Sequence, residues 1–149
     1  VRFDPFAMLP FTGYNVGDYF AHWLEIGQGA DSERLPRLFW VNWFRRDEDR
    51  SFLWPGFGEN CRVLDWVLQR VDGGGDAVET PIGLVPTVDA IDRTGIDVDD
   101  AAMERLLDVD PTAWEAELAM IEEHYDALGE RLPAELRRQL EGLRDRLDA

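Results

Sequence analysis

The residues whose types and spacing could do chemistry lie between positions 44 and 60. Phe44 ends the aromatic run "RLFWVNWF", and Phe52 follows it after the polar loop "RRDEDRS". Phe57 comes next, after the turn-forming pair Pro55-Gly56 in "FLWPGFGEN". Three rings that converge from a strand end and a turn could form a slot for a planar heterocycle, because stacking on an aromatic side chain stabilises a base by about 1–3 kcal/mol.

Stacking hardly distinguishes one base from another, so discrimination requires a polar group at the edge of the base. Asn60 closes the same stretch, and its side chain offers one acceptor and two donors. It stands at the predicted start of a helix over 60–71, where free backbone N–H groups also point outward. An alternative interpretation is that the three rings belong to a hydrophobic core and that Asn60 only caps this helix. The residues by themselves leave both interpretations open.

No second set of residues in the sequence completes a catalytic site. All fifteen basic residues are arginine, so the chain offers no lysine for a phosphate loop, a Schiff base or a general base. His22 falls in an apolar helix and is expected to be structural, whereas His124 lies in the acidic run "EEHYD" and is expected to be exposed. The single cysteine, Cys61, is expected to be a small buried residue rather than a reactive thiol. Because no spacing of His, Cys and carboxylates makes a closed metal site, we expect neither a catalytic residue nor a metal ligand in this chain.

The composition argues against several classes of function. The chain has 149 residues, is 45% hydrophobic and 11% aromatic, and carries a formal net charge of -16. It is long enough for one domain with a core, and its negative charge argues against binding a nucleic-acid backbone or an anionic membrane surface. No apolar run approaches the roughly 18 residues of a membrane span, and the first residues do not form a secretory signal. Together with a lone cysteine, which cannot form an internal disulfide, these features favour a cytoplasmic protein.

The elements that would hold the aromatic residues are predicted from periodicity and from turn and capping signals. The glycine loop at 73–75 separates an aromatic half, residues 1–71, from an acidic half, residues 72–149. The first half is predicted to contain an irregular segment over 4–15, a helix over 16–27, a strand over 37–44 and the helix over 60–71. The second half is predicted to contain a short strand over 80–86 and two helices that begin at Pro111 and Pro133. This pattern indicates a mixed α/β (α+β) fold, with short strands beside the aromatic residues and a C-terminal helical tail.

Three stretches of the sequence resemble the C-terminal part of GTP-dependent phosphoenolpyruvate carboxykinase. They are "DPFAMLPFTGYNVGDYFAHWL", "VNWFRRDEDRSFLWPGFGENCRVLDW" and "TPIGLVP". The resemblance runs from about position 4 to the end of the chain; it is highly specific over 41–66 and loose over the acidic helical tail. It implies that residues 1–149 are a single C-terminal fragment of the carboxykinase fold, with residues 1–71 as the guanine-binding half.

The resemblance also implies an activity and a ligand. The family enzyme, a carboxy-lyase of gluconeogenesis, interconverts oxaloacetate plus GTP with phosphoenolpyruvate, carbon dioxide and GDP, and it uses Mn²⁺ or Mg²⁺. The implied protein is cytoplasmic and monomeric, and it binds neither nucleic acid nor a membrane. Its guanine would be enclosed by Phe44, Phe52 and Phe57 and hydrogen-bonded at its edge by Asn60, with the backbone of Phe57, Gly58 and Glu59 lining the same pocket.

Departures from the family pattern limit what this chain is expected to do alone. The phosphate loop with its lysine, the manganese ligands, the oxaloacetate-binding arginines and the mobile lid of the family are all expected upstream of Val1. We therefore expect residues 1–149 to be inactive by themselves. Cys61 stands where the family usually has serine, and Leu9 stands where it often has arginine. The alternative is a stand-alone, non-catalytic guanine-nucleotide-binding or interaction module.

Overall fold

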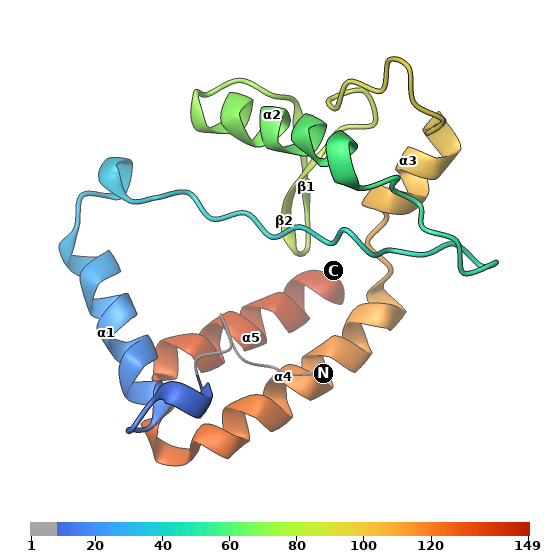
Figure 1. Ribbon diagram of the computed structural model, residues 1–149. Helices are drawn as coiled ribbons and strands as arrows, with labels where there is room; N and C mark the ends of the chain where they lie inside the picture. Colours follow the sequence, from blue (N-terminus) through green and yellow to red (C-terminus); the bar gives the residue numbers. More distant parts are fainter. Residues whose placement is uncertain (1–8) are drawn as a thin grey trace. The chain divides into compact units, whose positions relative to one another are not determined.

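The chain forms two compact units in the computed structural model, which describes residues 9–149 (Figure 1). One unit combines the residues up to Pro36 with Asp110–Ala149, and the other is Arg37–Val109. The start of the segment predicted to be irregular, residues 4–8, lies outside the described part, and the remainder contains one short 3-10 turn, Leu9–Phe11. Among residues 9–149, none of the helices has the length and apolar character that crossing a bilayer requires.

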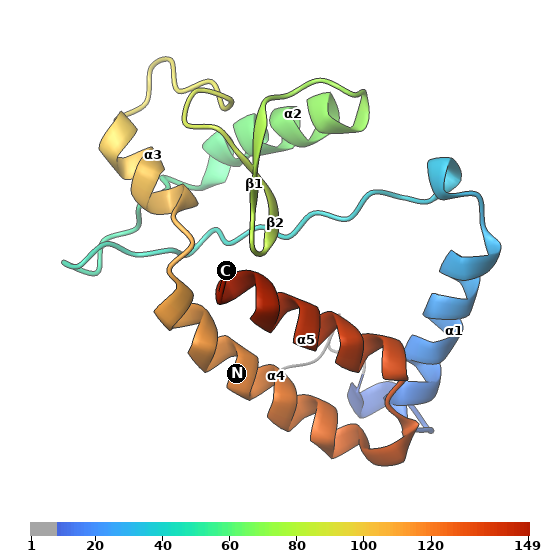
Figure 2. The same cartoon turned by 180° about the vertical axis from the view of Figure 1, so that it is seen from behind.

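The first unit is built from helices α1 (Val16–Gly29), α4 (Pro111–Leu128) and α5 (Ala134–Leu147). Asn15 caps α1 by accepting the N–H of Gly17 at 2.8 Å, and Asp110 caps α4 by accepting the N–H of Thr112 at 2.9 Å. Helices α4 and α5 lie side by side in both views (Figure 1 and Figure 2). The three helices predicted for these segments are confirmed, with Pro133 in the N-cap position of α5.

The first unit has a small apolar core at the meeting point of these helices. Val16, Leu128 and Leu132 are buried together, and the side chains of Tyr19, Phe20, Tyr125 and Leu136 pack against them. Asn15 joins the same region, because its Nδ2 donates to the carbonyl of Leu128 at 3.2 Å. The start of α1 is therefore held against the end of α4 by both apolar and polar contacts.

The second unit contains α2 (Asn60–Val71), α3 (Asp100–Leu107) and an antiparallel pair of strands, β1 (Ala77–Thr80) and β2 (Gly83–Pro86). Helix α2 confirms the helix predicted over 60–71. The strand predicted over 80–86 is confirmed only for β2, because the chain reverses at residues 81–82 and Thr80 belongs to β1, in which Val78 pairs with Val85. Helix α3 has no counterpart among the predicted elements; Asp99 caps it by accepting the N–H of Ala102 at 2.8 Å.

The strand predicted over 37–44 is wrong within the described part of the chain. Residues 35–42 run without regular secondary structure, and Trp43 and Phe44 lie in a turn. A β-strand needs a hydrogen-bonded neighbour, and none of residues 9–149 provides one for this segment. The side chains of Leu38 and Trp40 are 88% and 98% exposed, so the apolar composition that suggested a strand is present without the pairing that would form one.

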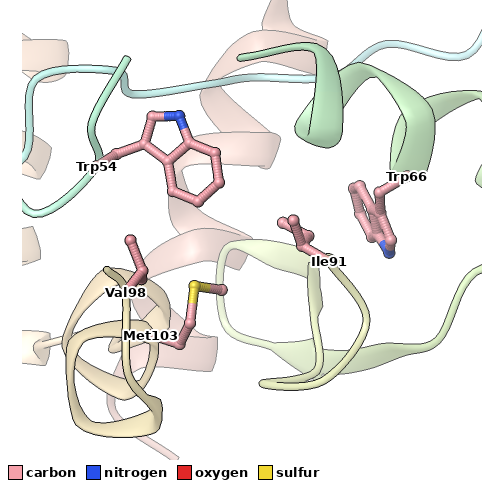
Figure 3. Close-up of a cluster of buried hydrophobic side chains, with 5 residues drawn as sticks. All are labelled: Trp54, Trp66, Ile91, Val98 and Met103. Carbon is pink, nitrogen blue, oxygen red and sulfur yellow. The ribbon is translucent and has the colours of Figure 1, made fainter. Parts of the chain in front are cut away.

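Figure 3 shows the core of the second unit, in which Trp54, Trp66, Ile91, Val98 and Met103 are buried together. These residues come from both sides of the glycine loop at 73–75, so the compositional boundary between residues 71 and 72 falls inside this unit. The indole N–H of Trp66 donates to the carbonyl of Asp76 at 3.0 Å, which ties α2 to the segment that leads into β1. Each large side chain buried here stabilises the unit by about 1.5–3 kcal/mol.

Candidate functional site

A short hairpin-like loop brings Phe44 close to Phe52. Arg46 pairs with Phe52 as an antiparallel bridge, and the N–H of Leu53 donates to the carbonyl of Arg45 at 3.0 Å. The Phe44 and Phe52 rings are 6.2 Å apart between centroids and inclined at 60°, which is an edge-to-face arrangement. Their side chains are 72% and 51% exposed, so these rings face solvent rather than a core.

Two polar contacts hold the backbone on either side of Phe44. The N–H of Phe44 donates to Oδ1 of Asn42 at 2.9 Å, which closes a side-chain turn just before the ring. The neighbouring Arg45 donates from Nη1 to the carbonyl of Asp108 at 2.7 Å and to that of Leu106 at 3.2 Å. The segment that carries Phe44 and Arg45 is thereby attached to the C-terminal end of α3.

Phe57 is presented by a backbone that turns sharply at Pro55-Gly56. Gly56 has φ +76° and Phe57 has φ +49°, a left-handed conformation that costs a residue with a Cβ about 1–2 kcal/mol. The N–H of Glu59 then donates to the Gly56 carbonyl at 3.1 Å and begins the 3-10 turn Phe57–Glu59. The Phe57 side chain is 95% exposed, so this strained turn displays the ring in solvent.

The structure brings the rings of Phe44 and Phe52 together, without a ring contact to Phe57. Within residues 9–149, the ring contacts of the second unit join Phe44 with Phe52 and Phe39 with Trp66, and none includes Phe57. The interpretation that all three rings are core residues is wrong, because each of them is more than half exposed. Gly58 is also exposed, and Glu59 is half-buried at the junction with α2.

Asn60 has a structural partner that the sequence did not indicate. Its Oδ1 accepts a hydrogen bond from Nε1 of Trp54 at 3.0 Å, and its own N–H is bonded to the carbonyls of Phe57 and Gly58. Asn60 is the first residue of α2; the N-cap position is Glu59, and no side chain caps the helix there. The interpretation of Asn60 as only a helix cap is therefore wrong, and Trp54 is the residue near this site that sequence reasoning missed.

The comparisons with known proteins agree on one family. The family model described as "Phosphoenolpyruvate carboxykinase C-terminal P-loop domain" matches residues 1–146. The chain belongs to the phosphoenolpyruvate carboxykinase family. Proteins named "Phosphoenolpyruvate carboxykinase [GTP]" from Paenarthrobacter aurescens, Neocallimastix frontalis and Treponema pallidum are 54%, 51% and 49% identical to it, over 99%, 100% and 99% of the chain. The chain spans 24% of the length of each of these carboxykinases.

A salt-bridged arginine fastens the first turn of α2 in this carboxykinase-family chain. Arg62 lies 2.5 Å from the Glu59 carboxylate, and it donates to the carbonyl of Asp92 at 2.8 Å and of Thr94 at 3.0 Å. The hydrogen bond from Arg62 to Glu59 raises the pKa of the Arg62 guanidinium. Hydrogen bonds from Thr94, followed by the charge of Arg62, lower the pKa of Asp92. These contacts hold the turn at residues 57–62 against the loop at residues 92–94.

An open hollow beside this arginine is lined by charged and small residues rather than by the three phenylalanines. Cys61 is exposed at its edge, so the expectation of a buried cysteine is wrong. The hollow is lined by Gly58, Glu59, Cys61, Arg62, Asp65 and Asp92. Its carboxylates and single arginine leave it net acidic, which disfavours a phosphate group there.

Neither histidine takes part in a site among the residues that the structure describes. His22 is exposed on α1, contrary to the expected structural role, because the apolar stripe of that helix turns Val16 rather than His22 into the core. His124 is half-buried rather than exposed, and its ring lies 6.3 Å from that of Tyr125. No three His, Cys, Asp or Glu side chains among residues 9–149 come together to hold a metal ion.

Proposed function

We propose that this chain is the guanine-binding part of a GTP-dependent phosphoenolpyruvate carboxykinase. The whole protein would convert oxaloacetate and GTP to phosphoenolpyruvate, carbon dioxide and GDP. The observation that carries the proposal is the 49–54% identity, over 99–100% of the chain, to proteins named for that activity. On the same family resemblance, we propose that the whole protein acts in gluconeogenesis, is cytoplasmic and is a monomer.

In this proposal the exposed aromatic residues bind the base. Phe44 and Phe52 already form an edge-to-face pair, and Phe57 is displayed on the adjoining turn. Stacking on such rings contributes about 1–3 kcal/mol per base without selecting among bases. Asn60, together with the backbone of Phe57, Gly58 and Glu59, would then supply the polar contacts that select guanine.

The phosphates and the chemistry would be handled by other parts of the protein. The chain contains no lysine, which a phosphate-binding loop requires, and its described residues hold no cluster fit for a metal ion. The Mn²⁺ or Mg²⁺ and the oxaloacetate or phosphoenolpyruvate of the proposed reaction would therefore bind outside residues 9–149. This chain's own contribution would be to bind and orient the nucleotide through its base.

The nucleotide preference of the complete protein tests the proposal. Guanine offers a keto oxygen and a ring N–H where adenine offers an amino group and a ring nitrogen acceptor, so a site built for guanine leaves buried groups unpaired with adenine. Each unpaired group costs about 1–3 kcal/mol. We expect kcat/KM for oxaloacetate decarboxylation to be at least about 10-fold higher with GTP than with ATP. Equal values would refute the guanine assignment.

The isolated chain tests the proposed division of labour between these residues and the rest of the protein. Purified residues 1–149, shown by circular dichroism to be helical, should catalyse no GTP-dependent decarboxylation of oxaloacetate in the presence of manganese. A stand-alone module would bind GDP without any other part of a protein and would have no catalytic role. Turnover by the isolated chain would place the chemistry within these residues and overturn the proposed division of labour.

A further inference from the structure

We propose that Trp54 is a positioning residue that fixes the amide of Asn60 so that its NH₂ group faces the base. This inference rests on the proposed guanine site and adds the group that sets its selectivity. It starts from a single contact, the hydrogen bond of 3.0 Å from Nε1 of Trp54 to Oδ1 of Asn60.

The chemistry of the indole decides which way the amide points. An indole N–H can only donate, whereas an asparagine amide has one accepting and one donating end. The end that faces Trp54 must therefore be the oxygen, because the opposite orientation would set two donors against each other and leave both without a partner. The NH₂ group occupies the other branch of the planar amide, directed away from the indole.

Both partners of this hydrogen bond are held in place. The Trp54 side chain is only 5% exposed and packs in the core of the second unit. Figure 3 shows its nitrogen on the edge of the ring that faces away from Val98 and Met103. Asn60 is held by its position at the start of α2 and by its N–H, which is bonded to the carbonyls of Phe57 and Gly58. The amide is thus oriented before any ligand binds.

A fixed NH₂ group selects for an acceptor on the base. Guanine presents O6 and N7 as acceptors, whereas adenine presents a donating amino group in the place of O6. The oriented Asn60 amide would therefore donate to guanine O6 and oppose the adenine amino group. Were the amide free to rotate, its oxygen could accept from adenine instead, and the selectivity would fall. Hypoxanthine also carries O6, so the Asn60 NH₂ group would donate to this base as it does to guanine.

The experiment measures dissociation constants of GDP, IDP and ADP by calorimetry on the complete protein and its variants. Trp54→Phe removes the indole N–H and retains an aromatic side chain of similar shape. We expect it to lower the preference for GDP over ADP about 10-fold, the effect of one hydrogen bond between well-oriented groups. The preference for IDP over ADP should fall by the same factor, since hypoxanthine, the base of IDP, carries the same O6 as guanine.

Trp66→Phe is the matched control. Trp66 is also 5% exposed, lies in the same core and donates its indole N–H at 3.0 Å, but to the carbonyl of Asp76 rather than to Asn60. A general loss of core packing would affect both variants alike, whereas the positioning role predicts a change of base preference in Trp54→Phe only. Equal changes in the two variants, or no change in either, would overturn the inference.

Two Asn60 variants test the inference further, and the first of them keeps it testable if Trp54→Phe fails to fold. Asn60→Asp can still accept from Trp54 but has no donor for O6, so we expect GDP to lose more affinity than ADP. In the Asn60→Ala background, Trp54→Phe should change base preference no further, because its effect passes through the amide. An unaltered preference in Asn60→Asp would overturn the inference. Equal binding of GDP and ADP by the unmodified protein would instead refute the guanine site itself.

Discussion

The guanidinium carbon of Arg46 lies 4.2 Å from the centroid of the Phe52 ring. Arg46 also donates from Nη1 to the carbonyl of Arg50 at 2.9 Å, which keeps the cation over the ring. The cation therefore occupies one face of Phe52, and a base stacking on this ring must use the other face. An exposed contact of this kind contributes about 0.5–1 kcal/mol, so Arg46 orients the ring without burying it.

Replacing Arg46 should weaken nucleotide binding modestly. We predict that Arg46→Leu in the complete protein raises the dissociation constant of GDP about 2- to 5-fold, since the Phe52 ring loses the contact that orients it. Calorimetric titration with GDP measures the effect. Arg144→Leu on α5 removes the same charge from a salt bridge, the one with Glu122 at 3.3 Å, and serves as the control. Equal weakening in the two variants would show that net charge, rather than the ring contact, is responsible.

Phe57→Ala should reduce GDP affinity while leaving the fold almost unchanged. With 95% of its side chain exposed, Phe57 contributes little burial, so the free energy of unfolding without ligand should change by about 0.5 kcal/mol or less. A core phenylalanine would lose about 3–5 kcal/mol. The dissociation constant of GDP should rise by a factor equivalent to about 1–3 kcal/mol of lost stacking.

Met103→Ala provides the contrasting case for the Phe57 experiment. Met103 is 1% exposed in the core of the second unit, and its truncation should cost about 2–5 kcal/mol of unfolding free energy. Denaturant unfolding without nucleotide compares the two variants. If Phe57→Ala proved as destabilising as Met103→Ala with GDP affinity unchanged, the ring would have a packing role and the proposed aromatic site would lose a member.

The order of stability of two Phe57 variants should report the strained backbone. Phe57 has φ +49°, which glycine adopts without the clash that a Cβ creates. We predict that Phe57→Gly is more stable than Phe57→Ala by about 1 kcal/mol. In an ordinary helical conformation alanine would instead be the more stable of the two. Thermal unfolding of both variants measures this order of stability. A more stable Phe57→Ala would contradict the left-handed conformation of residue 57.

Two glycines of α1 should respond oppositely to alanine. A Cβ on Gly17 would lie 2.4 Å from the carbonyl oxygen of Arg131, closer than any real contact, whereas a Cβ on Gly27 would meet nothing within 4 Å. We predict that Gly17→Ala destabilises the protein and that Gly27→Ala stabilises it by about 0.5–1 kcal/mol. Unfolding midpoints of the two variants test this, and a stabilising Gly17→Ala would contradict the close approach of α1 to residue 131.

Asp92 should make the loop beside α2 sensitive to acid. Its Oδ1 accepts the N–H of Thr94 at 2.9 Å, and the hydrogen bonds from Thr94 hold the pKa of Asp92 below its ordinary value. A carboxyl group with a lowered pKa contributes stability that is fully present above its ordinary pKa. That stability is lost as the pH falls through the folded-state pKa.

Removing the Thr94 hydroxyl should raise the pKa of Asp92. We predict that Thr94→Ala shifts this pKa only part of the way to its ordinary value, because the backbone N–H of residue 94 still donates to the carboxylate. Less of the stability that Asp92 contributes would then be present at neutral pH, and the pH range over which it is lost, between the ordinary and the folded-state pKa, would be narrower. Carbon-detected NMR titration of the Asp92 carboxyl measures the shift, and an unchanged pKa would show that Thr94 does not hold this carboxylate.

Local signals predicted helices α1, α2, α4 and α5 correctly because the causes of these helices lie within a few residues. Asp110 and Pro111 define the start of α4 through a side-chain cap and a proline at the first helical position. The apolar spacing over 60–71 was likewise sufficient for α2. The predicted strand over 37–44 failed for the opposite reason: aromatic and β-branched composition does not supply a strand's partner, which no described residue provides.

The sequence by itself determined four of the helices (α1, α2, α4 and α5), the family and the set of aromatic residues, because caps, periodicity and the run at 41–66 are properties of neighbouring residues. Only the tertiary structure decided what those residues face. The exposure of Phe44, Phe52 and Phe57 depends on which other side chains fill the core. The partner of Asn60 depends on how the turn at Pro55-Gly56 carries Trp54 back against α2. An amide has the same donors and acceptor in any sequence, and only its neighbours in space determine which of them remains for a ligand.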